Sequence, residues 1–236
     1  MSEASSPVAI VTGAGSGIGL ATARILAAAG WDIVLAGRRE QMLTDARDTL
    51  TPGQHHCVPT DVGDPESCAA LIRHVAGATS RIDALINNAG YAPLTPIAKH
   101  TPDLVRQTFE INALGPANLI LAAWPYMSSR KSGRIVNVSS IATVDPFPGF
   151  FAYAAAKASV ELMVKSIAKE GASVGIKGFA VAPGAVETDM LRSIIPERSL
   201  PRNKALSPET VAQVIADCVL GDRDSDNGKT ILVPSP

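Results

Sequence analysis

The sequence predicts an α/β fold: a doubly wound parallel sheet of about seven strands with helices on both faces. Short apolar runs alternate with segments of helical periodicity along all 236 residues, which is typical of right-handed βαβ units. Hydrophobic residues make up 46% of the chain and aromatic residues only 4%, so small aliphatic side chains supply the core, as in helices packed on a parallel sheet. The length suits a single domain, 1–236, that needs no disulfide or metal to be stable.

Seven short apolar runs are the expected strands, and they occur in order with helical segments between them. Continuous apolar character over a few residues is typical of strands that are covered on both faces. The expected strands are residues 7–12, 31–36, 55–59, 82–87, 134–139, 177–182 and 230–233. Ligands of such a sheet bind beyond the carboxyl ends of its strands, so the functional residues are expected there.

Helical periodicity fills the intervals between these strands. Thr101 and Ser207 each precede a proline and are expected to cap the helices that begin there, because a hydroxyl accepts from a free backbone N–H and proline suits the first helical position. Gly115-Pro116 falls inside the longest helix and is expected to bend it. The expected helices are 17–29, 40–50, 65–79, 102–127, 151–171 and 208–219.

Charge and composition argue against several classes of protein. The net charge is -1 and no basic stripe stands out, so no nucleic acid partner is expected. Three widely spaced cysteines without a leader pattern in residues 1–7 indicate reduced thiols in a cytoplasmic protein. No apolar run approaches ~18 residues, so no membrane span is expected. No metal site is expected at His55-His56-Cys57, because adjacent strand residues point to opposite faces.

A glycine-rich loop follows the first strand and opens the first helix. Glycine permits a turn with positive φ, a close approach of backbone to phosphate and tight packing of helix on strand, and the helix N-terminus directs its N–H groups at that phosphate. The alternative is a plain strand–helix turn. The residues expected to bind a dinucleotide here are Gly13, Gly15, Ser16, Gly17, Ile18 and Gly19.

The end of the second strand indicates which dinucleotide binds. An NAD site commonly has an Asp or Glu there to bond the ribose hydroxyls, whereas Gly37 holds this place. Arg38 and Arg39 can instead pair with a 2′-phosphate, so NADP(H) is expected in preference to NAD(H). The alternatives are that both arginines are a solvated helix start, or that Glu40 makes a ribose contact.

These segments, together with motifs farther along, resemble the short-chain dehydrogenase/reductase family. The resemblance runs motif by motif from residue 8 to about 190 and weakly beyond. Its further motifs are Asn87-Asn88-Ala89-Gly90, Ser139-Ser140, Tyr153-Ala154-Ala155-Ala156-Lys157 and Pro183-Gly184-Ala185-Val186-Glu187-Thr188. The resemblance implies a single-domain Rossmann-type sheet and hydride transfer between a nicotinamide and a carbonyl or secondary alcohol.

Tyr153 and Lys157 lie four residues apart and therefore share a helix face. A free tyrosine titrates near ~10, and a nearby ammonium and an oxidised nicotinamide would lower its pKa. Tyr153 is expected to donate a proton to a carbonyl oxygen, or to accept one from an alcohol. Lys157 is also expected to bond the nicotinamide ribose. The resemblance places the catalytic serine second in its pair, so Ser140 rather than Ser139 is expected to hold the substrate oxygen.

Other residues are expected to complete the site. Asn112 is expected to hold a water that relays protons from Lys157, and the alternative is a polar side chain that faces outward. Asp61 is expected either to bond the adenine amino group or, like Asp64, to cap a helix. The resemblance implies that Thr188 bonds the nicotinamide carboxamide. Further cofactor contacts are expected at Val62, Asn88, Ala89, Gly90, Pro183, Gly184 and Val186, whereas Asn87 is expected to be structural.

Substrate choice is expected to come from residues 91–96 and 141–150 and from a mobile lid at about 187–205, in which Pro196 and Pro201 break the helices. The first two segments are apolar and favour an uncharged ketone or aldehyde. The lid favours an acidic substrate unless its charges are simply solvated. Its charged residues are Arg192, Arg198, Arg202, Lys204 and Glu197.

The helix at 151–171 is apolar on more than one side, and one side is expected in the core. The resemblance implies that another side packs against a second subunit, in a homodimer or homotetramer. The last strand leads into Pro234-Ser235-Pro236 where the family has an Asp-Gly-Gly turn, and this departure puts the tetramer in doubt.

Three alternatives to an NADP(H)-dependent carbonyl reductase remain open. One is an NAD-dependent alcohol dehydrogenase, and another is a dinucleotide sensor that lacks catalysis. A sensor needs no proton donor, so the Ser140, Tyr153 and Lys157 set argues against it. The third is a sugar-nucleotide epimerase or dehydratase, but those chains usually carry a sizeable second domain.

Overall fold

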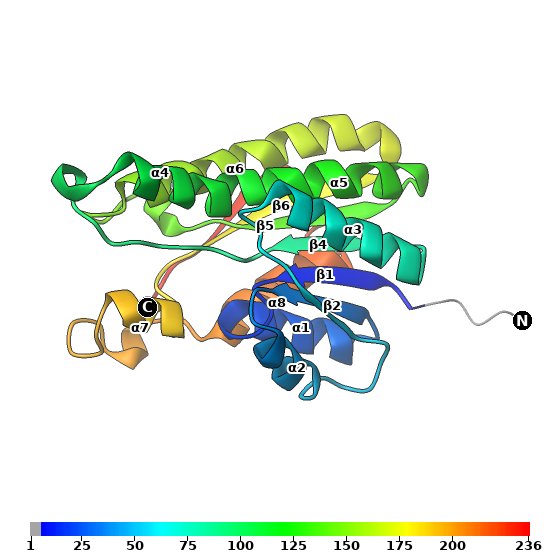
Figure 1. Ribbon diagram of the computed structural model, residues 1–236, viewed down its shortest axis with the longest axis horizontal. Helices are drawn as coiled ribbons and strands as arrows, with labels where there is room; N and C mark the ends of the chain where they lie inside the picture. Colours follow the sequence, from blue (N-terminus) through cyan, green and yellow to red (C-terminus); the bar gives the residue numbers. More distant parts are fainter. Residues whose placement is uncertain (1–5) are drawn as a thin grey trace, which may run out of the picture.

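A seven-stranded sheet runs through the centre of the molecule (Figure 1). The computed structural model describes residues 6–236. The strand order is β3-β2-β1-β4-β5-β6-β7, and every neighbouring pair is parallel. The strands are β1 Val8–Thr12, β2 Asp32–Gly37, β3 His56–Pro59, β4 Ala84–Asn87, β5 Gly133–Val138, β6 Ile176–Pro183 and β7 Thr230–Val233. The doubly wound parallel sheet is confirmed, and each strand lies where the sequence predicts it, with small shifts at its ends.

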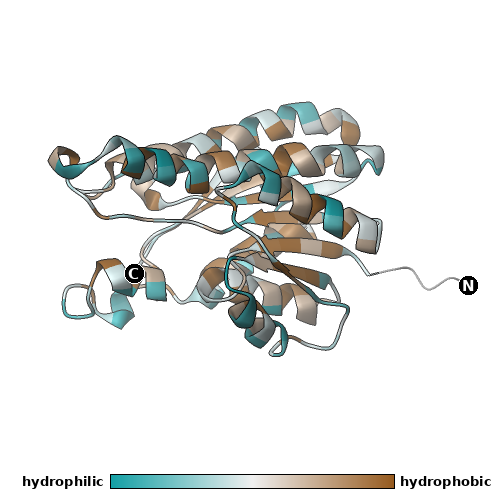
Figure 2. Ribbon diagram, in the orientation of Figure 1, coloured by the Kyte–Doolittle hydropathy of each residue, from teal (hydrophilic) through white to brown (hydrophobic). Residues whose placement is uncertain are grey.

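Helices cover both faces of this sheet, and each layer has its own half of the core. One layer holds α1 (Gly17–Ala28), α2 (Glu40–Arg47) and α8 (Pro208–Leu220), and the other holds α3 (Pro65–Thr79), α4, α5 and α6 (Phe151–Gly171) (Figure 1). The strands are hydrophobic almost throughout, whereas hydrophilic residues gather on the outward sides of the helices (Figure 2). The reversal of strand order between β1 and β4 is the place where such sheets bind ligands. Among the described residues, no helix has the length and hydropathy needed to cross a membrane.

The long helix expected over 102–127 is interrupted, but not at the expected residues. It consists of α4 (Pro102–Phe109), a π-helical segment η2 (Glu110–Leu114) and α5 (Gly115–Ser129). The irregular turn lies directly before Gly115-Pro116, where the bend was expected. Pro116 has no N–H for the carbonyl four residues before it, and a wider turn upstream accommodates the mismatch. A Cβ on Gly115 would lie 2.6 Å from the Val62 carbonyl oxygen, so glycine lets this helix approach the loop after β3.

The expected helix caps are present. Thr101 Oγ1 accepts from the Leu104 amide at 3.2 Å, and Ser207 Oγ accepts from the Thr210 amide at 3.1 Å. Of Asp61 and Asp64, it is Asp64 that caps α3, because its carboxylate accepts from the Glu66 amide at 3.0 Å. These side chains satisfy N–H groups that a helix leaves free at its start.

An ion-pair cluster ties the far end of the sheet to the last helix. Asp224 accepts from Arg134 Nη1 at 2.6 Å and from Lys177, so one carboxylate joins β5 and β6. Arg134 also donates to the Cys218 carbonyl in α8 at 2.8 Å. The hydrogen bonds from Arg134 and Lys177 lower the pKa of Asp224 to about 2.

We expect Asp224→Asn to lower the free energy of unfolding at pH 7 by about 1 kcal/mol, since the carboxylate is partly exposed and solvent screens the pairs. A lowered pKa stabilises the fold above the unfolded value, and this contribution is lost as the pH falls toward 2. Urea unfolding of both proteins should therefore give a constant difference above about pH 5 that shrinks below pH 4. The exposed Asp222→Asn is the control, and an equal loss in that variant would contradict the assignment.

Candidate active site

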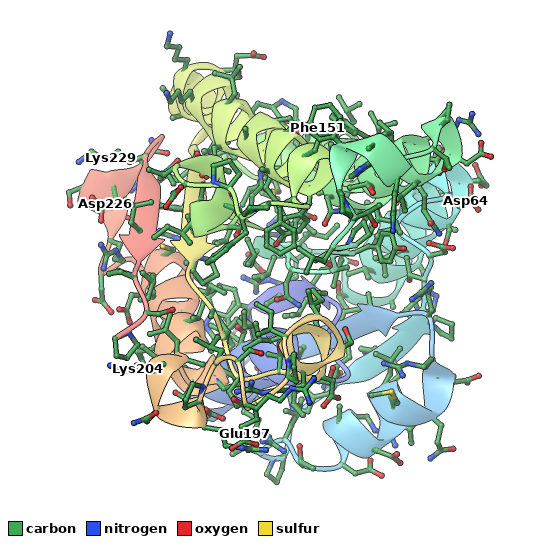
Figure 3. All side chains as sticks on the ribbon, turned by 90° about the vertical axis from the view of Figure 1, so that its left-hand side faces the viewer. Asp64, Phe151, Glu197, Lys204, Asp226 and Lys229 are labelled. Carbon is green, nitrogen blue, oxygen red and sulfur yellow. The ribbon has the colours of Figure 1, made fainter. Side chains whose placement is uncertain are left out.

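A cavity of about 610 Å³ opens at the carboxyl ends of the strands, around the reversal between β1 and β4. Figure 3 looks onto this end of the molecule, with Phe151 above and the lid residue Glu197 below. Nearly all residues expected from the sequence line it: Gly13, Gly15, Ser16, Gly17, Ile18, Arg38, Arg39, Asp61, Val62, Asn88, Ala89, Gly90, Ser140, Tyr153, Lys157, Pro183, Gly184, Val186 and Thr188. Gly19 and Asn112 are expected from the sequence but do not line the cavity.

The glycine loop has the backbone that the sequence predicts. Gly13 and Gly17 have φ of +66° and +53°, which side chains rarely tolerate. Gly19 lets the helix pack closely on the loop, because a Cβ there would collide with the Gly13 carbonyl and lie 2.6 Å from Asn88 Nδ2, and a cofactor contact by Gly19 remains a prediction. A Cβ on Gly17 would lie 3.0 Å from Thr188 Cγ2, so the loop and the segment after β6 meet across the cavity.

Thr12 joins the two strand ends that form the floor of the cavity, and sequence reasoning missed it. Its Oγ1 accepts from the amides of Asn88 and Ala89 at 3.0 Å each and donates to the Ile86 carbonyl at 3.2 Å. Asn88 Nδ2 donates to the Thr12 carbonyl at 2.8 Å. The sequence feature that could have identified Thr12 is a hydroxyl residue that ends an apolar strand directly before the glycine loop. These bonds show that the Asn88 side chain supports the sheet.

Ser140, Tyr153 and Lys157 meet at the inner end of the cavity. Ser140 follows β5 and makes a hydrogen bond with Tyr153 in the first turn of α6. Lys157, one turn later, is 4% exposed and donates from Nζ to the Val138 carbonyl at 2.7 Å. Its Nζ lies 5.9 Å from the centroid of the Tyr153 ring. The three groups therefore lie together on one wall.

Burial controls the acidity of this group of residues. It raises the pKa of Tyr153, and the hydrogen bond with Ser140 acts in the opposite direction. It lowers the pKa of Lys157 to about 8. The expectation that Lys157 lowers the Tyr153 pKa is wrong for the protein alone, because the ammonium bonds to the Val138 carbonyl and burial outweighs the other influences on Tyr153.

Asn112 lies in the π-helical segment and is fully buried. Its Oδ1 accepts from the Tyr91 amide at 3.1 Å, and its Nδ2 donates to the carbonyls of Tyr91 and Thr108 at 2.7 and 2.9 Å. The side chain therefore does not face outward, and a relay water held by Asn112 remains a prediction. A Cβ on Gly90 would lie 3.1 Å from Asn112 Oδ1 and 3.6 Å from Lys157 Nζ, so glycine keeps the space beside the lysine open.

The outer end of the cavity carries the basic residues expected near the adenosine. Arg38 and Arg39 follow β2, are exposed and line the cavity. Within residues 6–236, neither of them makes an ion pair with a carboxylate. Asp61 also lines this end, and its carboxylate accepts from the Gly63 amide at 2.9 Å. An adenine contact by Asp61 remains a prediction.

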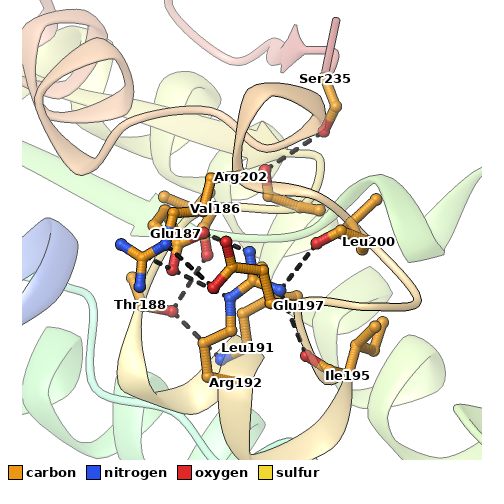
Figure 4. A network of polar contacts seen from close by, with 11 residues as sticks. Val186, Glu187, Thr188, Leu191, Arg192, Ile195, Glu197, Leu200, Arg202 and Ser235 are labelled. Atoms are coloured by element: carbon orange, nitrogen blue, oxygen red, sulfur yellow. Dashed lines mark hydrogen bonds and ion pairs between the residues drawn. The ribbon is translucent and has the colours of Figure 1, made fainter.

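The segment expected as a lid lies over the cavity and is closed on itself by polar contacts (Figure 4). Arg192 donates from Nε to Glu187 at 2.9 Å and from Nη1 to the Leu200 carbonyl at 2.8 Å, and Arg202 bonds Glu197 at 3.2 Å. The helix α7 (Asp189–Ile194) ends before Pro196, as predicted. Arg192 is therefore paired within the lid and does not line the cavity, contrary to a role in binding an acidic substrate.

Thr188 lines the cavity beside the lid, and Ser235 supports the loop before it. Thr188 caps α7, with Oγ1 accepting from the Leu191 amide and donating to the Val186 carbonyl, each at 3.2 Å. Ser235 donates to the Ala185 carbonyl at 3.2 Å (Figure 4). Ser235 also contacts the position that a Cβ on Gly184 would occupy, so this glycine lets the segment after β7 pack against the loop after β6.

Comparison with known proteins agrees with this geometry. The family model for short chain dehydrogenase matches residues 7–199. An uncharacterized oxidoreductase of Staphylococcus saprophyticus is 32% identical over 243 residues, covering 100% of this chain and 98% of the relative. A solved short chain dehydrogenase/reductase family protein superposes with a TM-score of 0.86 at 31% identity, covering 98% of this chain and 96% of that one. The crystal structure of gox2181 gives a TM-score of 0.90 at 28% identity, with 98% and 95% covered. The chain therefore is an oxidoreductase of the short-chain dehydrogenase/reductase family, whose members use NAD or NADP.

Proposed function

We propose that the protein transfers a hydride between NADP(H) and a carbonyl or secondary alcohol, with Tyr153 exchanging the proton of the substrate oxygen. The observation that carries the proposal is the meeting of Ser140, Tyr153 and Lys157 at the inner end of the cavity. The residues around the cavity fit a dinucleotide, because side chains would block the loop at Gly13 and Gly17 and because Arg38 and Arg39 lie at its outer end. The nicotinamide would supply or accept the hydride.

The protein residues then manage the proton. Tyr153 is neutral at pH 7 because burial raises its pKa, so its hydroxyl can donate to a carbonyl oxygen during reduction. Ser140 can donate to the same oxygen and stabilise charge that develops on it. Lys157, with a pKa of about 8, can exchange protons near neutral pH and lies within one helical turn of Tyr153. In alcohol oxidation, Tyr153 must first lose its proton, so this direction should be faster at alkaline pH.

The walls near Tyr153 favour an uncharged, apolar substrate. The ring centroids of Phe147 and Phe150 lie 6.4 Å apart, and those of Phe150 and Tyr153 lie 5.0 Å apart. Aromatic rings therefore line the cavity next to Tyr153. The lid adds four apolar residues to the lining: Met190, Leu191, Ile194 and Ile195. Of the charged lid residues, only Asp189 lines the cavity in the part of the chain that the structure describes, and its charge would repel an acid.

The direct test is NADPH oxidation by the purified protein against a panel of carbonyl compounds, with the alcohol product measured. We expect turnover of apolar ketones or aldehydes, and slower turnover of carboxylate-bearing analogues of the same size. Binding of NADPH, followed by its fluorescence, is measured in parallel. Tight binding with no alcohol from any carbonyl would favour a dinucleotide sensor and overturn the enzyme proposal.

We also propose that α5 and α6 pack against a second copy of the chain. Val160, Val164 and Ile167 on α6 are buried in the core, whereas Leu162 on the same helix and Leu121 on α5 are 64% and 71% exposed. These leucines, with Phe151, form an apolar outer face on two neighbouring helices. Such a face is typical of a subunit interface.

We expect the double variant Leu121→Asp, Leu162→Asp to shift the protein from dimer or tetramer to monomer in size-exclusion chromatography with light scattering. Two carboxylates would have to lose their hydration at the interface, and the free energy of this desolvation exceeds the free energy gained from the remaining apolar contact. Leu220→Asp, on α8 in the opposite helical layer, is the control because it is also exposed. A monomeric wild-type protein, or a double variant of unchanged mass, would refute this interface.

A further inference from the structure

We propose that Glu161 is a positioning residue that holds Ser140 in register with Tyr153 and Lys157. The inference rests on the proposed function and adds a residue to it. Glu161 lies on α6, four residues after Lys157 and eight after Tyr153, so it shares their side of the helix. Its Oε1 accepts from Ser139 Oγ at 2.6 Å and from Thr143 Oγ1 at 2.8 Å.

The two hydroxyls that Glu161 binds lie on either side of Ser140. Ser139, which is 2% exposed, directly follows β5, and its Oγ is also 3.3 Å from the Lys157 carbonyl. A serine hydroxyl has one hydrogen, and the shorter contact to a charged acceptor takes it. Ser139 is therefore held to the carboxylate, which fixes the residue before Ser140 against α6.

Thr143 fixes the other side. Thr143 ends the single 3₁₀ turn η3 (Ile141–Thr143), and its amide donates to the Ser140 carbonyl at 3.1 Å. Its hydroxyl also lies 2.9 Å from that carbonyl, but the one hydrogen goes to the shorter contact with the charged Glu161. The same turn orients the Ser140 side chain, because Ser140 Oγ accepts from the Ala142 amide at 3.2 Å. In this arrangement the Ser140 hydroxyl hydrogen remains available for Tyr153 or for a substrate oxygen. A rotation of the turn would move this hydrogen away from both.

The carboxylate thus connects two segments that reach the site independently. Ser140 arrives with β5 and η3, whereas Tyr153 and Lys157 arrive with α6, after the intervening residues 144–150. Catalytic groups must be held to within about 0.5 Å, and a displacement of about 1 Å can cost ~10²-fold in rate. Glu161 lines no part of the cavity, so it acts on the site through the Ser139-Ser140 segment that it holds, which does line it.

The test compares Glu161→Gln with Glu161→Leu in carbonyl reduction. Both hydroxyls bind the same oxygen, so the amide oxygen of glutamine can replace it, and we expect kcat within about threefold of wild type. Leucine cannot accept either bond, and we expect kcat to fall by about 30-fold while the Kd for NADPH, measured by fluorescence, stays within about twofold. Glu170→Leu, exposed on the same helix, is the control and should match wild type.

A second variant removes the bond from the other side. Thr143→Val keeps the shape of the side chain and leaves Glu161 in place, so a smaller loss of kcat with unchanged NADPH binding is expected even if Glu161→Leu proves unstable. If Glu161→Leu and Thr143→Val both have the same kcat as wild type, the proposal is overturned. Equal losses in Glu161→Gln and Glu161→Leu would also overturn it, because charge or packing would then be responsible. Failure of the proposed function is distinct, because the wild type and Glu170→Leu would then reduce no carbonyl.

Discussion

Replacing Tyr153 by phenylalanine is expected to lower kcat for carbonyl reduction by about a thousandfold, because positioned general acids contribute ~10²- to 10⁴-fold. The change removes one hydroxyl and keeps the ring that packs 5.0 Å from Phe150. The cavity should therefore retain its shape, and the Kd for NADPH should change by less than about threefold. Steady-state kinetics with the best substrate of the carbonyl panel, together with NADPH fluorescence titration, measure both quantities.

Two further variants test whether the loss of kcat comes from the proton of the Tyr153 hydroxyl. Tyr126→Phe removes a hydroxyl from α5, away from the cavity, and should leave kcat unchanged. Ser140→Ala keeps the tyrosine but removes the hydrogen bond that opposes the rise in its pKa. In alcohol oxidation, the rate of this variant should therefore rise at higher pH than that of wild type. A Tyr153→Phe enzyme that reduces carbonyls as fast as wild type would exclude Tyr153 as the acid.

The regular elements could be predicted from the sequence because their signals are local. Buried parallel strands are continuous apolar runs, and a hydroxyl before a proline marks a helix start, as at Thr101 and Ser207. The cofactor loop could be predicted for the same reason, since the positive φ of Gly13 and Gly17 favours glycine in any context. The family resemblance then placed the remaining motifs at the same edge of the sheet.

The irregular part of the long helix could not be predicted in the same way. Pro116 indicates that one hydrogen bond must be missing, but the sequence does not show whether the helix bends or widens. Gly115 also packs against the Val62 carbonyl of a distant loop, a contact that spacing along the helix does not reveal. The same segment buries Asn112, whose amide bonds Tyr91 and Thr108, and these partners could not be predicted from the sequence either.

Pairing between charged and polar side chains was the other source of error. The lid arginines appear in the sequence as free charges, yet Arg192 bonds Glu187, five residues away, and the Leu200 carbonyl (Figure 4). Glu161 and Leu162 are neighbours in the sequence, although the structure gives them different surroundings. Leu162 is 64% exposed, whereas Glu161 is directed toward Ser139 and Thr143. Such partners come from separate elements, so spacing along one helix cannot identify them.

Replacing Arg38 by alanine is expected to raise the KM for NADPH by about tenfold to a hundredfold and to change the KM for NADH by less than about threefold. A hydrogen bond to a charged group is worth about 1.5–3 kcal/mol, which corresponds to this range. Arg39→Ala, measured in the same way, assigns the share of the second arginine. Arg130→Ala, exposed at the end of α5, is the control for the loss of one positive charge. Equal losses for NADPH and NADH would remove the case for a phosphate contact.

The converse change gives the stronger test, because it supplies the group that an NAD site uses. Gly37 ends β2, and a Cβ there would meet only Leu43 Cδ2 at 3.4 Å, so Gly37→Asp should fold without strain. A carboxylate at this position would bond the ribose hydroxyls of NAD and repel a 2′-phosphate. We therefore expect Gly37→Asp combined with Arg38→Ala to reverse the preference toward NADH.

Because Arg38 is exposed, the preference of wild type for NADPH should also weaken as salt rises. The preference of the double variant for NADH should not change with salt. Two results together would contradict this assignment: an NADPH preference of wild type that does not change with salt, and an NADPH preference that remains in the double variant. Neither Arg38 nor the absence of an acid at position 37 would then select the cofactor.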